Sequence, residues 1–190
     1  MFKIYVVNQS DKKDFNRAKL FNIGYKLASE EQSWNCFILH DVDLLLENDN
    51  LMYNCRKGSR LPMHLSVAID KFGYKLPYPN IFGGVIQLSG EQMEYVNGFS
   101  NNYWGWGGED GDMRKRLIDF GNFTLNRPDE KIARYKMLKL DHKSGRVNKK
   151  KDKLLKNALD NRAVDGLNSL NFYVLKRKME IGYEIIAVDL

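Results

Sequence analysis

The chain has 190 residues and a formal net charge of +6, with 43% hydrophobic and 12% aromatic residues. This composition excludes a largely disordered chain and suits a single globular domain. Two cysteines are too few for a disulfide scaffold or a structural zinc site, and the sequence contains no run of about 18 apolar residues that could cross a membrane.

Strands and helices are predicted to alternate in the first half of the chain. Residues 4–7, Ile-Tyr-Val-Val, favour a β-strand. Apolar side chains spaced three and four apart predict a helix from Asp14 to Ser29, with Asp14 as its N-cap. Three further strands are predicted at residues 36–39, 65–69 and 83–88.

The second half of the chain is predicted to be less regular. Two helices are predicted, at residues 91–97 and 109–120, and the second ends at Gly121. After a brief strand at 124–126, the chain to about residue 160 is predicted to be a long mobile loop, followed by a last helix or a pair of strands. Such alternation indicates the α/β class, in which binding sites gather beyond the carboxyl ends of strands.

Aspartates follow two of the predicted strands. Asp41 and Asp43 come directly after residues 36–39, and Asp70 follows residues 65–69. Asp41 and Asp43 project to the same side of an extended chain, where two like charges repel unless a cation lies between or beside them. Oxygen ligands favour magnesium, calcium or manganese. The alternative is a loop with two solvated aspartates, because Asp-x-Asp is a common pattern.

Residues 103–112, Tyr-Trp-Gly-Trp-Gly-Gly-Glu-Asp-Gly-Asp, combine tryptophan, glycine and carboxylates. Glycine permits close approach of a ligand, and a tryptophan ring offers a flat apolar face for a sugar. Glu109, Asp110 and Asp112 fall in the first turn of the predicted helix, where the helix dipole keeps a carboxylate ionised and able to accept a proton. A helix N-terminus beside two core tryptophans would explain the acids but not the glycines, which instead predict that Trp104 and Trp106 belong to a moving loop.

Lysine and arginine gather between Lys136 and Lys156. Such a segment can attract phosphate, nucleic acid or acidic glycans, although a solvated loop is the ordinary interpretation. The segment lacks interleaved aromatic residues, which argues against nucleic acid as a partner. Met137 and His142 could bind a metal, although a histidine in a basic loop is more commonly a surface residue.

Seven segments together resemble the animal β-1,4-galactosyltransferase family: FNRAKLFNIGY, CFILHDVDLL, LSVAIDKFGYKLPY, FGGVIQLS, NGFSNNYWGWGGEDGDMRKRL, RYKML and DGLNSL. Their order and spacing match from Ile4 to about Asp189. The resemblance implies a GT-A fold, a Rossmann-like nucleotide-sugar transferase fold, in one catalytic domain over residues 1–190. Family members also carry an earlier strand and a Pro-Phe-Arg-x-Arg segment, so the domain is expected to lack the first N-terminal strand.

The resemblance implies an inverting, Mn²⁺-dependent transfer of galactose or N-acetylgalactosamine from a UDP-sugar to the 4-hydroxyl of a terminal N-acetylglucosamine, glucose or xylose. Asp110 matches the general base, and Glu109 matches its sugar-contacting partner. The implied donor contacts are Phe15, Arg17, Asp41, Val42, Asp43, Lys71, Ile81 and Trp106. The implied acceptor contacts are Tyr78, Trp106, Gly107, Glu109 and Asp110. The implied metal ligands are Asp43, Met137 and His142.

The resemblance also implies a disulfide between Cys36 and Cys55, a pairing that the residues alone leave open against two buried thiols. The basic residues 139–153 overlap a long flexible loop of the family, which favours a lid over a nucleic-acid surface. For the catalytic domain of a type II membrane protein the implied compartment is the Golgi lumen, with the membrane anchor outside this chain. For a viral or bacterial relative it is the cytoplasm.

Three positions depart from the family pattern. The metal-binding histidine usually stands at the position of Leu140, so His142 is expected to take its place. Ile81 stands where galactose-specific members place a tyrosine, which predicts that UDP-GalNAc is accepted at least as well as UDP-Gal. Gly111 replaces an acid, with little expected effect on the chemistry. The alternative function is an inactive, glycan-binding or truncated relative of the family.

Overall fold

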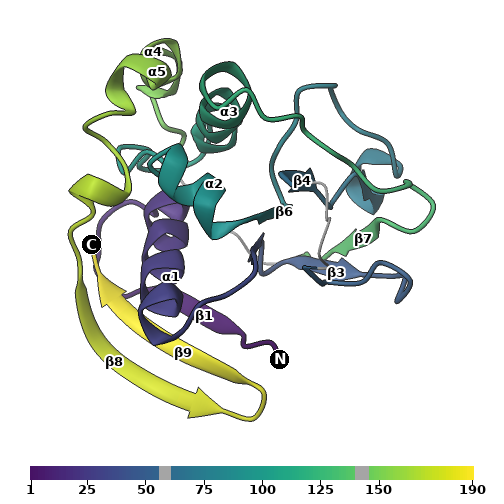
Figure 1. Cartoon of the computed structure of the whole chain (residues 1–190), viewed down its shortest axis with the longest axis horizontal. Helices are drawn as coiled ribbons and strands as arrows, with labels where there is room; N and C mark the ends of the chain where they lie inside the picture. The colour runs from purple at the N-terminus through teal and green to yellow at the C-terminus, as the bar shows by residue number, and fades with distance from the viewer. Residues whose placement is uncertain (56–60, 140–145) are drawn as a thin grey trace.

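The computed structural model describes residues 1–55, 61–139 and 146–190. Within these residues the strands form three three-stranded sheets, in the orders β1-β9-β8, β2-β6-β4 and β3-β7-β5 (Figure 1). The elements in chain order are β1 (Tyr5–Gln9), α1 (Arg17–Glu31), β2 (Phe37–His40), β3 (Leu44–Leu46), β4 (Met63–His64), β5 (Ala68–Ile69), η1 (Asp70–Phe72), β6 (Val85–Leu88), α2 (Gly90–Tyr95), α3 (Glu109–Lys115), η2 (Arg116–Phe120), β7 (Arg134–Met137), α4 (Lys151–Lys156), α5 (Ala158–Asn161), η3 (Leu167–Ser169), β8 (Tyr173–Glu180) and β9 (Tyr183–Asp189). None of the helices in the described ranges is both long and apolar enough to span a bilayer.

The first sheet joins the two ends of the chain. β1 runs parallel to β9, and β9 pairs antiparallel with β8, so the C-terminal segment is a pair of strands. Helix α1 packs against this sheet, and its Ile23 meets Ile186 and Val188 of β9 in one buried cluster. The N-cap of α1 is Asn16, whose side chain accepts a hydrogen bond from the Lys19 amide at 2.9 Å. The prediction of Asp14 as the cap was therefore wrong by two residues.

The second and third sheets lie on the other side of α1 and carry the central core. Every residue of β6 is buried, and its neighbours β2 and β4 both run antiparallel to it. Leu88 of β6 belongs to one buried cluster with Met93 of α2 and Met113 of α3. In the third sheet, β7 runs antiparallel to β3 and parallel to β5. The α/β class predicted from the sequence is confirmed, although only some neighbouring strands are parallel.

Three local predictions were wrong, the first of them for a tertiary reason. Residues 65–69 are not one strand, because the chain turns at Leu65–Val67 and passes from the second sheet to the third. Residues 124–126 form only an isolated bridge, between Asn126 and Met63. The segment predicted to be a long loop up to about residue 160 contains β7, α4 and α5.

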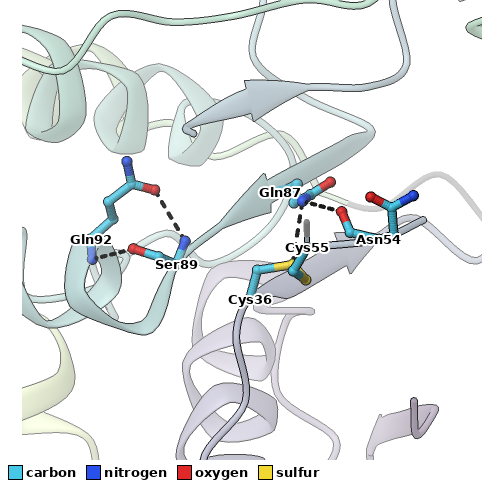
Figure 2. Close-up of a disulfide and its surroundings, with 6 residues drawn as sticks. All are labelled: Cys36, Asn54, Cys55, Gln87, Ser89 and Gln92. Atoms are coloured by element: carbon cyan, nitrogen blue, oxygen red, sulfur yellow. Dashed lines mark hydrogen bonds between the residues drawn. A yellow bond between two sulfur atoms is a disulfide. The ribbon is translucent and has the colours of Figure 1, made fainter. Parts of the chain in front are cut away.

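Cys36 and Cys55 form a disulfide, as the family resemblance implied, with their Cα atoms 5.7 Å apart (Figure 2). The amide of Gln87 on β6 donates to the Asn54 carbonyl at 2.9 Å and to Cys36 Sγ at 3.3 Å. The bridge therefore ties the start of β2 to the segment that follows β3. At the end of β6, a reciprocal capping box between Ser89 and Gln92 begins α2 (Figure 2).

A buried arginine anchors the helix that follows the glycine-rich segment. Arg116 is 0% exposed and donates to Asp112 Oδ1 at 2.5 Å. It also donates to the carbonyls of Gly98 at 3.1 Å and Asp165 at 2.8 Å. Tyr103 donates its hydroxyl to the second Asp112 oxygen at 3.0 Å. The network joins three distant chain segments and fixes the position of α3.

Replacing Arg116 with methionine leaves the Asp112 carboxylate buried without its cation. We expect the free energy of unfolding to fall by about 3–5 kcal/mol, the usual cost of breaking a buried ion pair, measured by urea denaturation. Lys153→Met, at an exposed position of α4, is the control and should change the free energy by less than about 0.5 kcal/mol. Equal effects of the two substitutions would contradict an anchoring role for Arg116.

Candidate active site

One arginine and three carboxylates form the charged centre of the candidate site. Arg17 Nε donates to Asp41 Oδ1 at 2.5 Å, and Arg17 Nη1 donates to Asp110 Oδ1 at 2.7 Å. The same nitrogen lies 3.4 Å from Glu109 Oε1. The Arg17 guanidinium also lies over the Phe21 ring at 4.5 Å, which limits its motion. The structure thus brings four of the predicted site residues into direct contact.

Three separate elements deliver these side chains. Arg17 is the first residue of α1, Asp41 directly follows β2, and the two acids Glu109 and Asp110 begin α3. α3 can begin there because Gly108 takes a φ of 100°, a conformation that residues with a side chain rarely adopt. The acids therefore lie at the positive end of the α3 dipole, as the sequence predicted.

Gly83 brings the main chain unusually close to Asp110. A Cβ atom on Gly83 would overlap Asp110 Oδ2, so any larger residue here would displace that carboxylate. The next residue, Gly84, accepts a hydrogen bond from the Asp41 amide at 3.1 Å. Sequence reasoning assigned no role to this glycine pair. The signal was the Gly-Gly pair directly before a buried strand, which indicates close approach of another group.

Burial and neighbouring charges together shift the pKa values of the groups in this cluster. Burial raises the pKa of Asp41, and the Arg17 guanidinium only partly offsets this effect. Burial and the Asp110 charge likewise raise the pKa of Glu109. Glu109 Oε2 is buried and has no hydrogen-bond partner among the residues that the structure describes. Burial disfavours the Arg17 cation, but the three carboxylates outweigh it and raise the pKa of Arg17. The centre therefore carries excess negative charge that a cation or a hydroxyl donor would relieve.

Two of the three predicted metal ligands, Asp43 and Met137, lie at one end of the third sheet. Leu44 pairs with Met137, and the Leu138 amide donates to the Asp43 carbonyl at 2.7 Å, so Asp43, directly before β3, lies beside the end of β7. Asp70 reaches the same end, because its Oδ1 accepts from the Met137 amide at 2.9 Å. Of these groups, the carboxylate oxygens suit a hard divalent cation such as manganese, whereas the thioether is a softer ligand.

His142, the third predicted ligand, lies outside the described residues. In the described part of the chain, no three histidine, cysteine or acidic side chains come together in a way that could hold a metal ion. The main chains of Asp43 and Met137 are therefore adjacent, and the metal site itself stays a prediction.

The two tryptophans of the glycine-rich segment have different surroundings. Trp106 is 69% exposed, and its main chain bonds to Arg146 and Asn148 at 2.9 and 3.0 Å. Trp104 instead packs against the apolar cluster between α1 and β9. The prediction that both rings belong to a movable loop was thus wrong for Trp104. The amide of Gly105, between the two rings, donates to the Phe15 carbonyl at 2.8 Å, which holds this segment beside the start of α1.

The remaining predicted residues surround the charged cluster or face solvent. Tyr78 is 55% exposed, and burial together with the charges of Asp110 and Glu109 raises the pKa of its hydroxyl. Ile81 is half-buried on the same loop, and Gly107 has a φ of 107° beside Lys151. The side chains of Phe15, Val42 and Lys71 are exposed. Asp112, considered as a third acid of the site, belongs instead to the Arg116 network.

Two family models match the chain. One, described as the N-terminal region of glycosyl transferase group 7, covers residues 1–56, and the other, described as the N-terminal domain of galactosyltransferase, covers residues 63–143. Human β-1,4-galactosyltransferase 3 is 42% identical over 190 residues, which are 100% of this chain and 48% of that protein. Chinese hamster (Cricetulus griseus) β-1,4-galactosyltransferase 4 is 44% identical over 189 residues, 99% of this chain and 54% of that protein. The chain thus spans about half the length of these relatives.

Solved structures give the same result. The catalytic domain of Drosophila β-1,4-galactosyltransferase 7 in complex with xylobiose superposes with a TM-score of 0.79 at 30% identity, over 99% of this chain and 80% of that one. A mutant of that enzyme in complex with manganese, UDP-Gal and xylobiose superposes with the same TM-score at 28% identity, over the same shares of the two chains. The GT-A fold expected from the sequence is therefore confirmed.

Substitution of Glu109 with glutamine is expected to stabilise the protein at neutral pH by about 1 kcal/mol, because it removes one charge from an overcharged cluster. The folded-state pKa of Glu109 lies above its ordinary value of 4.5, so the ionised side chain destabilises the fold at neutral pH. This cost, and with it the gain from Glu109→Gln, should disappear as the pH falls below about 4.5.

Urea denaturation at pH 7 and pH 4 measures this effect. Glu130→Gln, at an exposed position, is the control and should change little at either pH. A destabilised Glu109→Gln protein at pH 7 would contradict the proposed charge balance.

Proposed function

The chain belongs to the β-1,4-galactosyltransferase family, and on that premise we propose that it transfers galactose or N-acetylgalactosamine from a UDP-sugar to the 4-hydroxyl of a terminal sugar, with inversion. The observation that carries the proposal is the contact of Asp110 with Arg17 and Gly83, beside the exposed Trp106. It combines a carboxylate held in one orientation with an open surface on which a sugar can lie.

Asp110 is proposed as the general base. Its Oδ1 accepts the hydrogen bond from Arg17, which leaves Oδ2, on the Gly83 side, to take the proton of the acceptor hydroxyl. Inversion requires this base on the face of the sugar opposite the leaving diphosphate. Glu109, buried and with one oxygen unpartnered, supplies an acceptor for a sugar hydroxyl in the same place.

The donor is proposed to lie along Phe15, Arg17, Asp41 and Lys71. Mn²⁺ bound by Asp43, Met137 and His142 would neutralise charge on the leaving diphosphate. The Drosophila relative was crystallised with manganese and UDP-Gal, which supports this choice of ion and donor. Asp41 is held by Arg17 and by the Gly84 carbonyl, so its carboxylate keeps one orientation next to Asp43.

The acceptor is proposed to lie between Trp106 and Tyr78, both of which expose aromatic surface near Asp110. The same Drosophila relative binds xylobiose, which supports a terminal xylose, N-acetylglucosamine or glucose as the acceptor class. The main chain of Trp106 bonds to Arg146 and Asn148, so a movement of residues 146–153 would move Trp106 as well. Residues 140–145 of the predicted lid lie outside the described residues. The Cys36–Cys55 disulfide supports an oxidising compartment such as the Golgi lumen.

Replacing Asp110 with asparagine should lower kcat about 100-fold or more, because a general base contributes roughly 10²–10⁴ in rate. Transfer from radiolabelled UDP-Gal measures the rate, and calorimetry with UDP and Mn²⁺ tests whether donor binding is retained. Asp119→Asn, at an exposed position of η2, is the matched control. Near-normal turnover by Asp110→Asn would exclude Asp110 as the base.

UDP should stabilise the protein only together with Mn²⁺. At a ligand concentration 100 times its Kd the gain is about 2.7 kcal/mol, which corresponds to a rise in Tm of roughly 5–10 °C for a chain of this size. Asp43→Ala should abolish the Mn²⁺-dependent rise, and Asp49→Ala, at an exposed position, should not. The absence of any rise in the unchanged protein would favour the alternative, an inactive glycan-binding relative.

Donor choice is expected to depend on Ile81. In a competition assay the unchanged protein should use UDP-GalNAc at least as well as UDP-Gal, because isoleucine leaves room for an N-acetyl group. Ile81→Tyr should shift the preference toward galactose, whereas Ile81→Val should not. Ile81 bonds to Tyr78 and Arg127 through its main chain, so both substitutions leave these hydrogen bonds in place. No shift with tyrosine would count against the assignment of Ile81 to the donor-sugar contact.

A further inference from the structure

Two side chains outside the charged cluster bind the main chain of the loop that faces it. Arg127 Nη2 donates to the carbonyls of Pro79 at 2.8 Å and Ile81 at 3.0 Å. Arg127 Nε lies 3.3 Å from His64 Nδ1, and His64 Nε2 lies 2.9 Å from the Gly83 carbonyl. Three carbonyls of residues 79–83 are thus held by one connected pair of side chains.

The partners determine the protonation of His64. A carbonyl can only accept, so Nε2 carries the hydrogen that goes to Gly83. A guanidinium can only donate, so Nδ1 is unprotonated and accepts from Arg127. Burial lowers the pKa of His64 to about 4, so the neutral ring that this arrangement needs is present at neutral pH. His64 is 0% exposed, on β4 at the edge of the second sheet (Figure 1).

The loop held in this way carries groups assigned above to the reaction. Tyr78 and Ile81 belong to it, and Gly83 at its end contacts the Asp110 carboxylate. Ser66 Oγ gives the Gly83 carbonyl a second donor at 3.0 Å and accepts from the Val85 amide at 2.8 Å. The Gly83 end is therefore doubly held, whereas the Pro79 and Ile81 carbonyls share Arg127 as their donor.

We propose that Arg127 and His64 are positioning residues, which hold residues 78–83 at the distance from Asp110 that the transfer step requires. The inference rests on the proposed function. Neither side chain would touch a substrate; both act through the main chain of the loop. A displacement of about 1 Å in a reacting group can lower a rate about 100-fold, so a clamp on this loop would control kcat.

Arg127 is well suited to a test because it is exposed and belongs to none of the apolar clusters. Substituting it removes the clamp without opening a cavity, whereas substituting the fully buried His64 would also test folding. The variants are Arg127→Met, which keeps the length of the aliphatic chain, and Arg127→Lys, which restores one donor. Arg162→Met is the matched control, because Arg162 stacks on Phe120 at 3.5 Å at the end of α5, distant from β4 in Figure 1.

The experiment measures kcat and KM for UDP-Gal with xylobiose as acceptor, the urea midpoint, and amide hydrogen exchange of residues 78–84, all on the full chain. Arg127→Met should lower kcat about 10- to 100-fold with KM for UDP-Gal within threefold, and should speed exchange of residues 78–84 severalfold. Arg127→Lys should recover part of both effects. The urea midpoint should stay close to that of Arg162→Met.

A kcat of Arg127→Met within twofold of the control would overturn the inference, as would a fall in kcat that only accompanies a lower urea midpoint. If the unchanged chain transfers no sugar from UDP-Gal or UDP-GalNAc, the proposed function fails, and hydrogen exchange then decides the clamp separately. Faster exchange confined to residues 78–84 in Arg127→Met would support the clamp. Unchanged exchange would overturn it.

Discussion

The site depends on one cation shared by three carboxylates. Arg17 stands at the start of α1 and binds acids that come from the end of β2 and from the first turn of α3. Without this guanidinium, three like charges would meet at a partly buried point, which is unfavourable in a medium of low polarity. The interaction is therefore a condition for the three elements to approach one another at all. It also leaves the cluster short of positive charge, a property suited to a site that receives a metal–diphosphate and a hydroxyl group.

A second arginine makes that arrangement rigid. Arg116 holds the inner side of α3 through Asp112 and two carbonyls, while Arg17 holds the acids at its first turn. Helix α3 is therefore held by Arg116 on its buried side and by Arg17 at its first turn, and these two contacts together set the direction of the Asp110 side chain. Glycine completes the geometry, because Gly108 permits the helix to begin where it does and Gly83 permits the main chain to reach Asp110. Asp110 is thus held by several contacts, whereas the nearby Trp106 ring is exposed.

Much of the site was predictable because its residues stand in short, specific segments. Glu109 and Asp110 were expected at the start of a helix, and α3 begins at Glu109. Asp41 and Asp43 were expected after a strand, and they follow β2. The disulfide followed from the family resemblance. Predictions from local patterns failed where a distant contact decided the outcome. Trp104 is partly buried because it packs against the cluster between α1 and β9, and residues 65–69 divide because they cross between two sheets.

The sequence by itself determined the family, the α/β class, the apolar strands and helices of the core, and the identity of most of the chemical groups. These properties depend on residue type and short-range spacing, which can be read directly from a sequence. Only the tertiary structure decided that Arg17 binds Asp41 and Asp110 together, that Asp112 belongs to Arg116, and that Gly83 lies against the proposed base. Each of these is a contact between segments that packing brings together, and no local periodicity encodes which of several acids a given arginine will reach.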